Sequence, residues 1–285
     1  MATIFFRANL YFFAYFSIFV FHFQINDAAV RQKGLPLYYW HEKSWGEKRN
    51  FGDYLSLKIV ERIVQTSVRV YDKDVDKDRK LLALGSILTY ARNNDVVWGS
   101  AVNGKWLDLK HYKFTTLDVR AVRGPLTREF LMRNFDIECP EVYGDPALLV
   151  PYLFPEFKKS ENPTCDYVII PAYNEITSFA GIENECIVLP TDPWDVVIKK
   201  ILNSKFVISS SLHGIVIAEA YGIPARLLYP QKESMFKYRD YYFGTNRFNF
   251  EVAYSIEEAL RMGGEKPMRC DIQKLYEAFP FEFWS

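Results

Sequence analysis

Short apolar runs alternate with amphipathic segments along most of the chain after residue 35. Buried parallel strands appear as continuous apolar runs, and the helices that connect them repeat apolar residues every three to four positions, so the alternation predicts an α/β fold with parallel sheets. The predicted strands are residues 37–40, 68–71, 81–84, 96–98, 119–122, 167–171, 187–189, 206–209 and 225–229, and the predicted helices start near residue 54 and cover residues 126–133, 193–203 and 215–221.

A proline-bearing stretch at residues 151–163 divides this alternation into two series and is typical of a linker. Two successive series of strand–helix units predict two doubly wound, Rossmann-like lobes. The predicted organisation is an apolar N-terminal extension at residues 1–34, an N-terminal lobe at 35–155, a C-terminal lobe at 156–265 and a C-terminal tail at 266–285.

The N-terminal extension contains an apolar run at residues 8–23, preceded by one basic residue, Arg7. The run is about 16 residues long, whereas a membrane-spanning helix needs roughly 20. Residues 25–29 form a poor signal-peptide cleavage site. A signal peptide, a membrane-associated anchor and a start codon assigned upstream of the true one all stay open. We predict that residues 1–34 are dispensable for catalysis, because every chemical motif follows them.

Composition restricts the partners and cofactors. The 35 Lys and Arg residues balance the 35 Asp and Glu residues, so no whole-chain positive field attracts nucleic acid. Neither a zinc site nor a disulfide framework is predicted, because the cysteines are scattered with no CxxC spacing. No carboxylate cluster suits another metal. The aromatic fraction of 17% is high and suggests a stacking surface for sugars or a membrane-facing segment. The cysteines are Cys139, Cys165, Cys186 and Cys270.

The strongest chemical signal is SSSLHG at residues 209–214, directly after a predicted strand. It brings Ser210, Ser211, His213 and Gly214 to the start of a helix, where free backbone N–H groups and the helix dipole favour an anion. His213 suits a general acid or base, because an imidazole titrates near neutral pH. The alternative is that the serines only cap the helix and His213 packs beneath the loop.

Further polar residues follow other predicted strands. Arg123 leaves strand 119–122 just before a turn, and its planar guanidinium suits a phosphate or carboxylate. The alternative is a surface arginine paired with Glu129. We expect Arg123 to be exposed in a cleft and the aromatic segment 238–242 to be a loop. The remaining candidates, each weak alone, are Asn50, Asp53, Gly99, Ser100, Asp145 and Lys237.

In this order, these motifs resemble the polysaccharide pyruvyl transferase family, over about residues 37–245. The matching motifs are NFGD at 50–53, WGS at 98–100, VRGP at 122–125, YGDP at 143–146, SSSLHG at 209–214 and AEAYGIP at 218–224. The resemblance implies a two-lobed fold like that of glycosyltransferase B enzymes. It also implies transfer of the enolpyruvyl unit of phosphoenolpyruvate to two hydroxyls of one sugar of an exopolysaccharide or its precursor. The products are a pyruvate ketal and inorganic phosphate, and no cofactor is needed.

The resemblance also assigns roles to individual residues. His213 corresponds to the proposed proton donor or base, and Arg123 to the arginine that binds the donor. Many members carry arginine just before Leu-His, where this chain has Ser211, so Arg123 and Lys237 are left to supply positive charge. We expect Asn50, Asp53, Gly99, Ser100, Asp145, Ser210, Ser211, Gly214 and Lys237 to bind substrate.

The resemblance further implies a glycan or lipid-linked oligosaccharide as acceptor. We expect a cytoplasmic protein, and peripheral association with the inner face of the plasma membrane stays open. Carboxyl-edge binding requires the motifs of both lobes to face one crevice. We expect that crevice to be locally positive and Trp98, Tyr238 and Tyr241 to line its rim. Two alternatives remain: a nucleotide-sugar-dependent glycosyltransferase with Glu219 on the ribose, and a non-catalytic scaffold of polysaccharide assembly.

Overall fold

The computed structural model describes residues 34–41, 50–179 and 186–285. Residues 33–285 form one compact unit. The expectations for the N-terminal extension fall on residues 1–33 and so lie outside the described residues. Within the described ranges, no helix has the length and apolar character needed to span a membrane.

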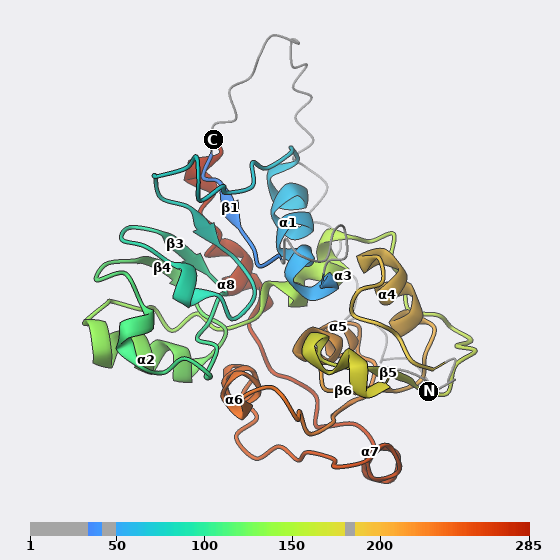
Figure 1. The fold of residues 1–285 in the computed structure, drawn as a ribbon. Helices are drawn as coiled ribbons and strands as arrows, with labels where there is room; N and C mark the ends of the chain where they lie inside the picture. Colours follow the sequence, from blue (N-terminus) through green and yellow to red (C-terminus); the bar gives the residue numbers. More distant parts are fainter. Residues whose placement is uncertain (1–33, 42–49, 180–185) are drawn as a thin grey trace, which may run out of the picture. The chain divides into compact units, whose positions relative to one another are not determined.

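Two separate parallel sheets organise the described chain (Figure 1). All hydrogen-bonded strand pairs within the two sheets are parallel, which confirms the predicted α/β class with parallel sheets. The first sheet has the order β1 (Leu37–Tyr38), β2 (Leu81–Leu82), β3 (Val96–Trp98) and β4 (Asp118–Ala121), and the second has the order β5 (Val168–Ile170), β6 (Val207–Ser209) and β7 (Ala225–Leu227).

Isolated bridges show that each sheet reverses its direction of growth beside its first strand. Val70 pairs with Leu37 on the edge of β1 away from β2, and Ile187 pairs with Ile169 on the edge of β5 away from β6. The predicted strands 68–71 and 187–189 are thus reduced to single bridges. A doubly wound sheet has this reversal, and ligands bind beside it at the carboxyl ends of the strands. The two reversals lie between β1 and β2 and between β5 and β6.

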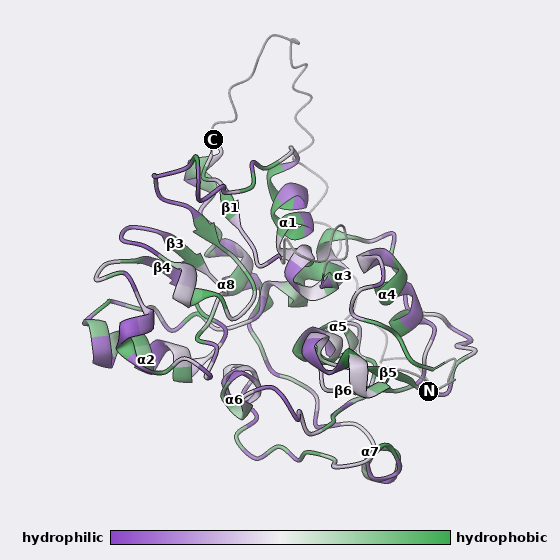
Figure 2. Ribbon diagram, in the orientation of Figure 1, coloured by the Kyte–Doolittle hydropathy of each residue, from purple (hydrophilic) through white to green (hydrophobic). Residues whose placement is uncertain are grey.

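Helices connect and cover these strands, and several are amphipathic: α1 and α4 each have a hydrophobic and a hydrophilic side in Figure 2. The helices are α1 (Phe51–Val64), α2 (Pro125–Phe135), α3 (Val150–Leu153), α4 (Trp194–Leu202), α5 (Leu212–Ala220), α6 (Met235–Gly244), α7 (Ile256–Met262) and α8 (Ile272–Glu277). Short 3₁₀ helices are η2 (Leu88–Tyr90), η3 (Leu109–His111), η4 (Pro146–Leu149), η5 (Tyr173–Phe179) and η6 (Phe281–Phe283).

Two sequence predictions about helices are wrong. Helix α1 begins at Phe51 rather than near residue 54, because the Asn50 side chain caps it by accepting a hydrogen bond from the Gly52 N–H. The predicted loop 238–242 is part of α6, whose N-cap is Ser234. The tyrosines of that segment have the i, i+3, i+4 spacing of one helical face and are fully buried, so packing favours the helix.

The C-terminal residues return to the first sheet. The Trp98 indole N–H donates to the Leu275 carbonyl at 2.8 Å, and its ring meets the Phe279 ring edge-on at 4.9 Å. Trp98 is therefore a fully buried core residue, and its prediction as a rim aromatic is wrong.

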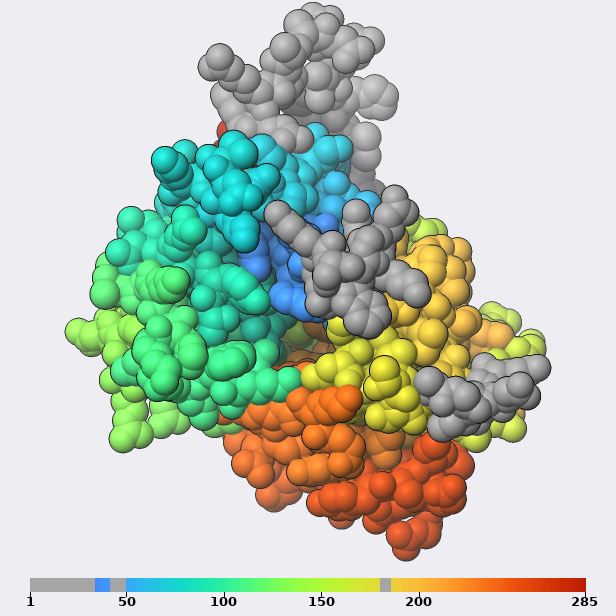
Figure 3. Space-filling view, in the orientation of Figure 1, coloured from blue at the N-terminus to red at the C-terminus, as the bar shows by residue number. Residues whose placement is uncertain are grey.

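Figure 3 shows the parts that contain the two sheets meeting around a central hollow, with blue to green residues on one side and yellow to orange residues on the other.

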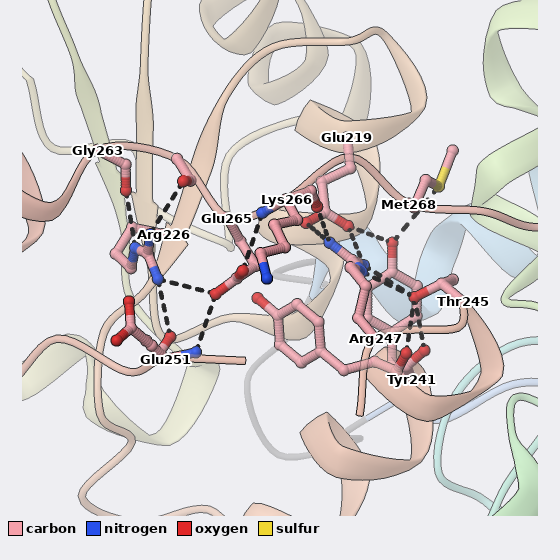
Figure 4. A network of polar contacts seen from close by, with 12 residues as sticks. Glu219, Arg226, Tyr241, Thr245, Arg247, Glu251, Gly263, Glu265, Lys266 and Met268 are labelled. Atoms are coloured by element: carbon pink, nitrogen blue, oxygen red, sulfur yellow. Dashed lines mark hydrogen bonds and ion pairs between the residues drawn. The ribbon is translucent and has the colours of Figure 1, made fainter. Parts of the chain in front are cut away.

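Two buried ion pairs fix the outer part of the second sheet (Figure 4). Glu219 on α5 accepts two hydrogen bonds from the Arg247 guanidinium, at 2.6 and 2.8 Å, and a third from the Tyr241 hydroxyl. Arg226 on β7 pairs with Glu265 at 2.9 Å. All four charged side chains are less than a tenth exposed. Removing one partner of such a pair leaves an uncompensated buried charge.

We therefore expect Glu219→Ala to lower the free energy of unfolding by about 3–5 kcal/mol, because Arg247 stays buried without its carboxylate. Urea denaturation followed by circular dichroism measures the change. The matched control is Lys205→Ala, which breaks the exposed pair with Asp166 and should cost less than about 1 kcal/mol. Equal effects of the two substitutions would contradict the assignment of Glu219 to a structural ion pair.

Candidate functional site

A pocket of about 430 Å³ lies at the carboxyl ends of the strands that flank both reversals. Its wall includes Trp40 after β1, Gly85 and Ser86 after β2, Tyr173 after β5 and His213 after β6. Figure 3 shows the hollow between the parts of the chain that carry these residues. The volume suits a small ligand. The place and size of the pocket together make it the candidate functional site.

The pocket contains part of the predicted set of site residues. Those that line it are Asn50, Asp53, Arg123, Ser211, His213 and Lys237. The others lie behind its wall: Gly99 packs on Pro146, the Ser100 hydroxyl donates to the Gly85 carbonyl, the Ser210 hydroxyl donates to Glu175, Asp145 caps η4, and Gly214 packs on Ser209 and Ile170. These residues shape the pocket without lining it.

His213, at the start of α5, packs against Gly52 of α1 and Asp145, the N-cap of η4. Its Nδ1 faces Gly52 so closely that a Cβ built at Gly52 would lie 1.9 Å away. Its Nε2 lies 3.6 Å from Oδ2 of Asp145, and neither atom has a hydrogen-bond partner among the described residues. Oδ1 of Asp145 accepts from the Ala147 N–H, which fixes the carboxylate. The imidazole thus has a fixed position beside a carboxylate and an uncommitted ring nitrogen.

Asp53 provides a second group that can exchange protons. Its Oδ2 accepts a hydrogen bond from the Asn50 amide at 2.8 Å. Burial raises the pKa of Asp53 to about 6, although the nearby charges of His213 and Lys237 act in the opposite direction. A carboxyl group with a pKa near 6 is present in both protonation states close to neutral pH, as general acid–base catalysis requires.

Arg123 is not the exposed residue that its sequence predicts, because only 1% of its surface is accessible. Its guanidinium donates to the Ser86 hydroxyl at 2.7 Å and to the Val102 carbonyl, and it lies 3.2 Å from Oδ2 of Asp240. Asp240 comes from α6, which no local pattern around Arg123 reveals. The ion-pair partner is Asp240 rather than Glu129.

Two lysines meet one carboxylate at another wall of the pocket. The ammonium groups of Lys105 and Lys237 lie 2.8 and 3.0 Å from the carboxylate of Glu233, which also accepts from the Asn174 amide. Burial lowers the pKa of Lys237, and Glu233 counteracts part of that effect. Lys105 and Glu233 belong to no motif of the sequence, because only the folded chain brings their loops together.

The aromatic rim also differs from the prediction. Tyr238 and Tyr241 are fully buried, so neither lines the rim. The aromatic residues of the pocket wall are instead Trp40, Tyr90, Trp106 and Tyr173. The Tyr90 and Trp106 side chains are 46% and 49% exposed, and Trp40 and Tyr173 pack edge-on at 5.4 Å. No sequence motif indicated that these four aromatic residues line the pocket.

The structure also tests the residue on which the glycosyltransferase alternative depends. Both carboxylate oxygens of Glu219 are engaged by Arg247 and Tyr241, and Glu219 does not line the pocket. No other acidic residue was a candidate for a ribose. In the described chain, no cluster of three or more His, Cys, Asp or Glu side chains could hold a metal ion.

The fold and the pocket define a Rossmann-like α/β protein with a pocket that holds a histidine, a carboxyl group of raised pKa and several cations at the carboxyl ends of two parallel sheets. The chain belongs to the polysaccharide pyruvyl transferase family, whose model matches residues 50–232.

Two curated proteins are similar to the chain. It is 28% identical over 200 residues to the succinoglycan biosynthesis protein ExoV of Rhizobium meliloti (strain 1021), covering 66% of this chain and 57% of that protein. It is 27% identical over 183 residues to the uncharacterized protein L143 of Acanthamoeba polyphaga mimivirus, covering 61% and 62%. The matched regions thus span about three fifths of these relatives. A solved structure of an uncharacterized Klebsiella pneumoniae protein aligns with a TM-score of 0.44 at 14% identity, over 74% of this chain and 87% of that one.

We expect Asp53→Asn to stabilise the protein above pH 6. The pKa of Asp53 is about 6 in the folded protein, against an ordinary value of 3.8 for an aspartate, so the folded state binds the proton more tightly than the unfolded state. The stabilising effect of this group is complete below about pH 4 and is lost as the pH rises to about 6. Urea denaturation at several pH values should show Asp53→Asn more stable by up to about 3 kcal/mol at pH 7. The difference should shrink towards pH 4, and a pH-independent difference would exclude a raised pKa.

Proposed function

We propose that this protein transfers pyruvate from phosphoenolpyruvate to a sugar of an exopolysaccharide or its precursor and forms a pyruvate ketal. The observation that supports this most is the pairing of two proton-exchanging groups, His213 and Asp53, with Lys105, Lys237 and Arg123 around one pocket. Membership of the polysaccharide pyruvyl transferase family and similarity to a succinoglycan biosynthesis protein of R. meliloti support pyruvyl transfer to an exopolysaccharide. We also propose that the two parallel sheets form lobes of the glycosyltransferase B kind.

The donor carries a carboxylate and a phosphate, so its site needs positive charge. Ser211 is the N-cap of α5 and makes no side-chain capping hydrogen bond. Leu212 and His213 of the first turn line the pocket, so this uncapped helix start favours an anion there. Many family members are expected to carry an arginine where this chain has Ser211. We propose that Lys105 and Lys237 supply the positive charge of that arginine here. Arg123 contributes charge from inside the wall.

The proposed chemistry uses each proton-exchanging group twice. His213 protonates the methylene carbon of the donor, one sugar hydroxyl attacks the adjacent carbon, and the proton of that hydroxyl returns to His213. Asp53 then protonates the phosphate as its C–O bond breaks, a second hydroxyl attacks, and its proton returns to Asp53. Both groups are thus regenerated, and the methyl group and the phosphate each gain one proton from the acceptor. Asp145 keeps the imidazole in place as a positioning residue.

The acceptor sugar is proposed to stack on the exposed rim aromatics Tyr90 and Trp106, because aromatic rings favour the C–H face of a pyranose. A lipid-linked oligosaccharide and a free glycan chain both present such a sugar. The donor is a cytoplasmic metabolite, so we infer a cytoplasmic reaction. A non-catalytic scaffold of polysaccharide assembly would bind glycan without releasing phosphate.

The purified protein should release inorganic phosphate from phosphoenolpyruvate only when a glycan acceptor is added. We expect His213→Ala to lower this rate by about 10²-fold or more, the usual size of a lost acid–base group. Gly52→Ala should have a similar effect, because its Cβ overlaps the imidazole, while Lys205→Ala serves as the control. Acceptor-independent release, or a His213→Ala rate above about a tenth of the wild-type rate, would refute the proposal.

Replacing either pocket lysine should weaken donor binding more than it slows turnover. We expect Lys237→Met and Lys105→Met each to raise KM for phosphoenolpyruvate about tenfold, the loss of roughly one charge-assisted hydrogen bond. Ser211→Arg in the Lys237→Met background should restore part of the affinity. Lys232→Met is the matched control, because Lys232 does not line the pocket. An unchanged KM in both lysine variants would remove these residues from the donor site.

A further inference from the structure

A second groove, of about 680 Å³, lies on the far side of α6 from the pocket. Met235, Arg239 and Phe243 line it at successive i, i+4 positions of that helix, whereas Lys237 lines the pocket. Residues four apart share a helix face, and residues two apart lie on opposite faces. Helix α6 therefore separates the two sites.

The groove exposes aromatic side chains. The rings of Tyr229 and Tyr254 are stacked at 5.1 Å with an angle of 23° between their planes, and Tyr254 is 71% exposed. Phe248 is 61% exposed and lies 5.3 Å from Phe243. Exposed aromatic side chains that form a group indicate a binding surface, whereas single exposed ones are ordinary.

Charged side chains without partners lie among these rings. Within the described ranges, the guanidinium of Arg239, the ammonium of Lys266 and the carboxylate of Glu251 form no hydrogen bond or ion pair. All three residues are exposed at the groove. They are free to bind hydroxyls or an anionic group on a ligand.

The floor of the groove is rigid because the two buried ion pairs of Figure 4 hold its backbone. Arg226 donates to the Glu251 carbonyl at 3.1 Å, and the Glu251 N–H donates to Glu265 at 2.9 Å. Arg247 donates to the Lys266 carbonyl at 3.1 Å. The exposed side chains thus stand on a preorganised base, which lowers the entropic cost of binding.

We propose that this groove binds a saccharide, as a glycan subsite separate from the reaction pocket. A pyranose presents a face of C–H groups, which packs on stacked aromatic rings, and a rim of hydroxyls, which suits the unpaired charged groups beside them. Two unpaired cations against one unpaired carboxylate favour a sugar that carries an acidic group. Arg239, Lys266 and Glu251 each need a polar partner when they are covered, which favours the hydroxyls of a sugar over an apolar face of a second copy of the chain. The choice of a glycan rests on the proposed function, but binding is measured without the donor.

The test is direct binding of two tetrasaccharides to the full protein, by saturation-transfer NMR and calorimetry without phosphoenolpyruvate. The probes are cellotetraose and a tetrasaccharide that contains glucuronic acid. We expect millimolar or tighter binding of both, with the acidic probe tighter. Tyr254→Ala should weaken both at least about tenfold, and Arg239→Gln should weaken chiefly the acidic one. All proteins in this test carry Trp106→Ala, which removes the proposed acceptor contact at the rim of the reaction pocket. Tyr152→Ala, at an exposed aromatic residue that lines neither the pocket nor the groove, is the matched control and should retain this binding.

Absence of binding of both probes at about 10 mM, or binding unchanged in Tyr254→Ala, overturns the proposal. A concentration-dependent dimer that Tyr254→Ala abolishes also overturns it, because the groove would then be an interface between copies. Phosphate release with a monosaccharide acceptor should be unchanged in Tyr254→Ala. A failure of the subsite is thereby distinguished from a failure of the transfer reaction.

Discussion

The packing of α6 against the turn between β4 and α2 determines the geometry of the pocket. Asp240 accepts from the N–H and the hydroxyl of Thr127 and pairs with Arg123, all fully buried. The two backbones approach so closely that a Cβ at Gly124 would lie 1.8 Å from the Asp240 carbonyl oxygen. This contact orients α6, so that Lys237 enters the pocket and the Tyr238 hydroxyl donates to the Ser210 carbonyl of the second sheet at 2.5 Å. One helix thus aligns the residues of both sheets.

Local rules explain what the sequence could predict, and this long-range contact explains what it could not. Asn50, Asp53 and His213 line the pocket because strand ends and helix starts place them there, and those signals lie within a few residues. The burial of Arg123 depends on Asp240, more than a hundred residues away in the chain. No motif indicates that Lys105 lines the pocket, because its position depends on the contact with Glu233. The parallel sheets could be predicted from the periodicity of apolar residues, whereas the packing of α6 against the turn between β4 and α2 could not.

Four of the nine buried side-chain polar atoms that lack a hydrogen-bond partner among the described residues belong to this site. Among the described residues, Nε of Arg123, Oδ2 of Asp145, Oδ1 of Asn174 and Nε2 of His213 are buried without a hydrogen-bond partner. Native proteins leave few such atoms, because each carries a desolvation cost. All four belong to residues that line the pocket or lie directly behind its wall. The raised pKa of Asp53 is a further cost at the same place. A fold tolerates such costs where a ligand offsets them.

Charge balance in the pocket gives the protonation of Asp53 a specific consequence for the proposed reaction. Two carboxylates already offset two of the three cations, since Arg123 pairs with Asp240 and both lysines share Glu233, and ionised Asp53 offsets the third. The expected locally positive crevice is therefore not found while Asp53 is ionised, because these acidic residues offset its cations. Asp53 is half-buried at the wall, and another anion beside it raises its pKa above about 6. By linkage, binding of a doubly anionic donor then draws a proton onto Asp53. That proton removes the repulsion between Asp53 and the donor, and on the proposed pathway it is the proton that the departing phosphate takes.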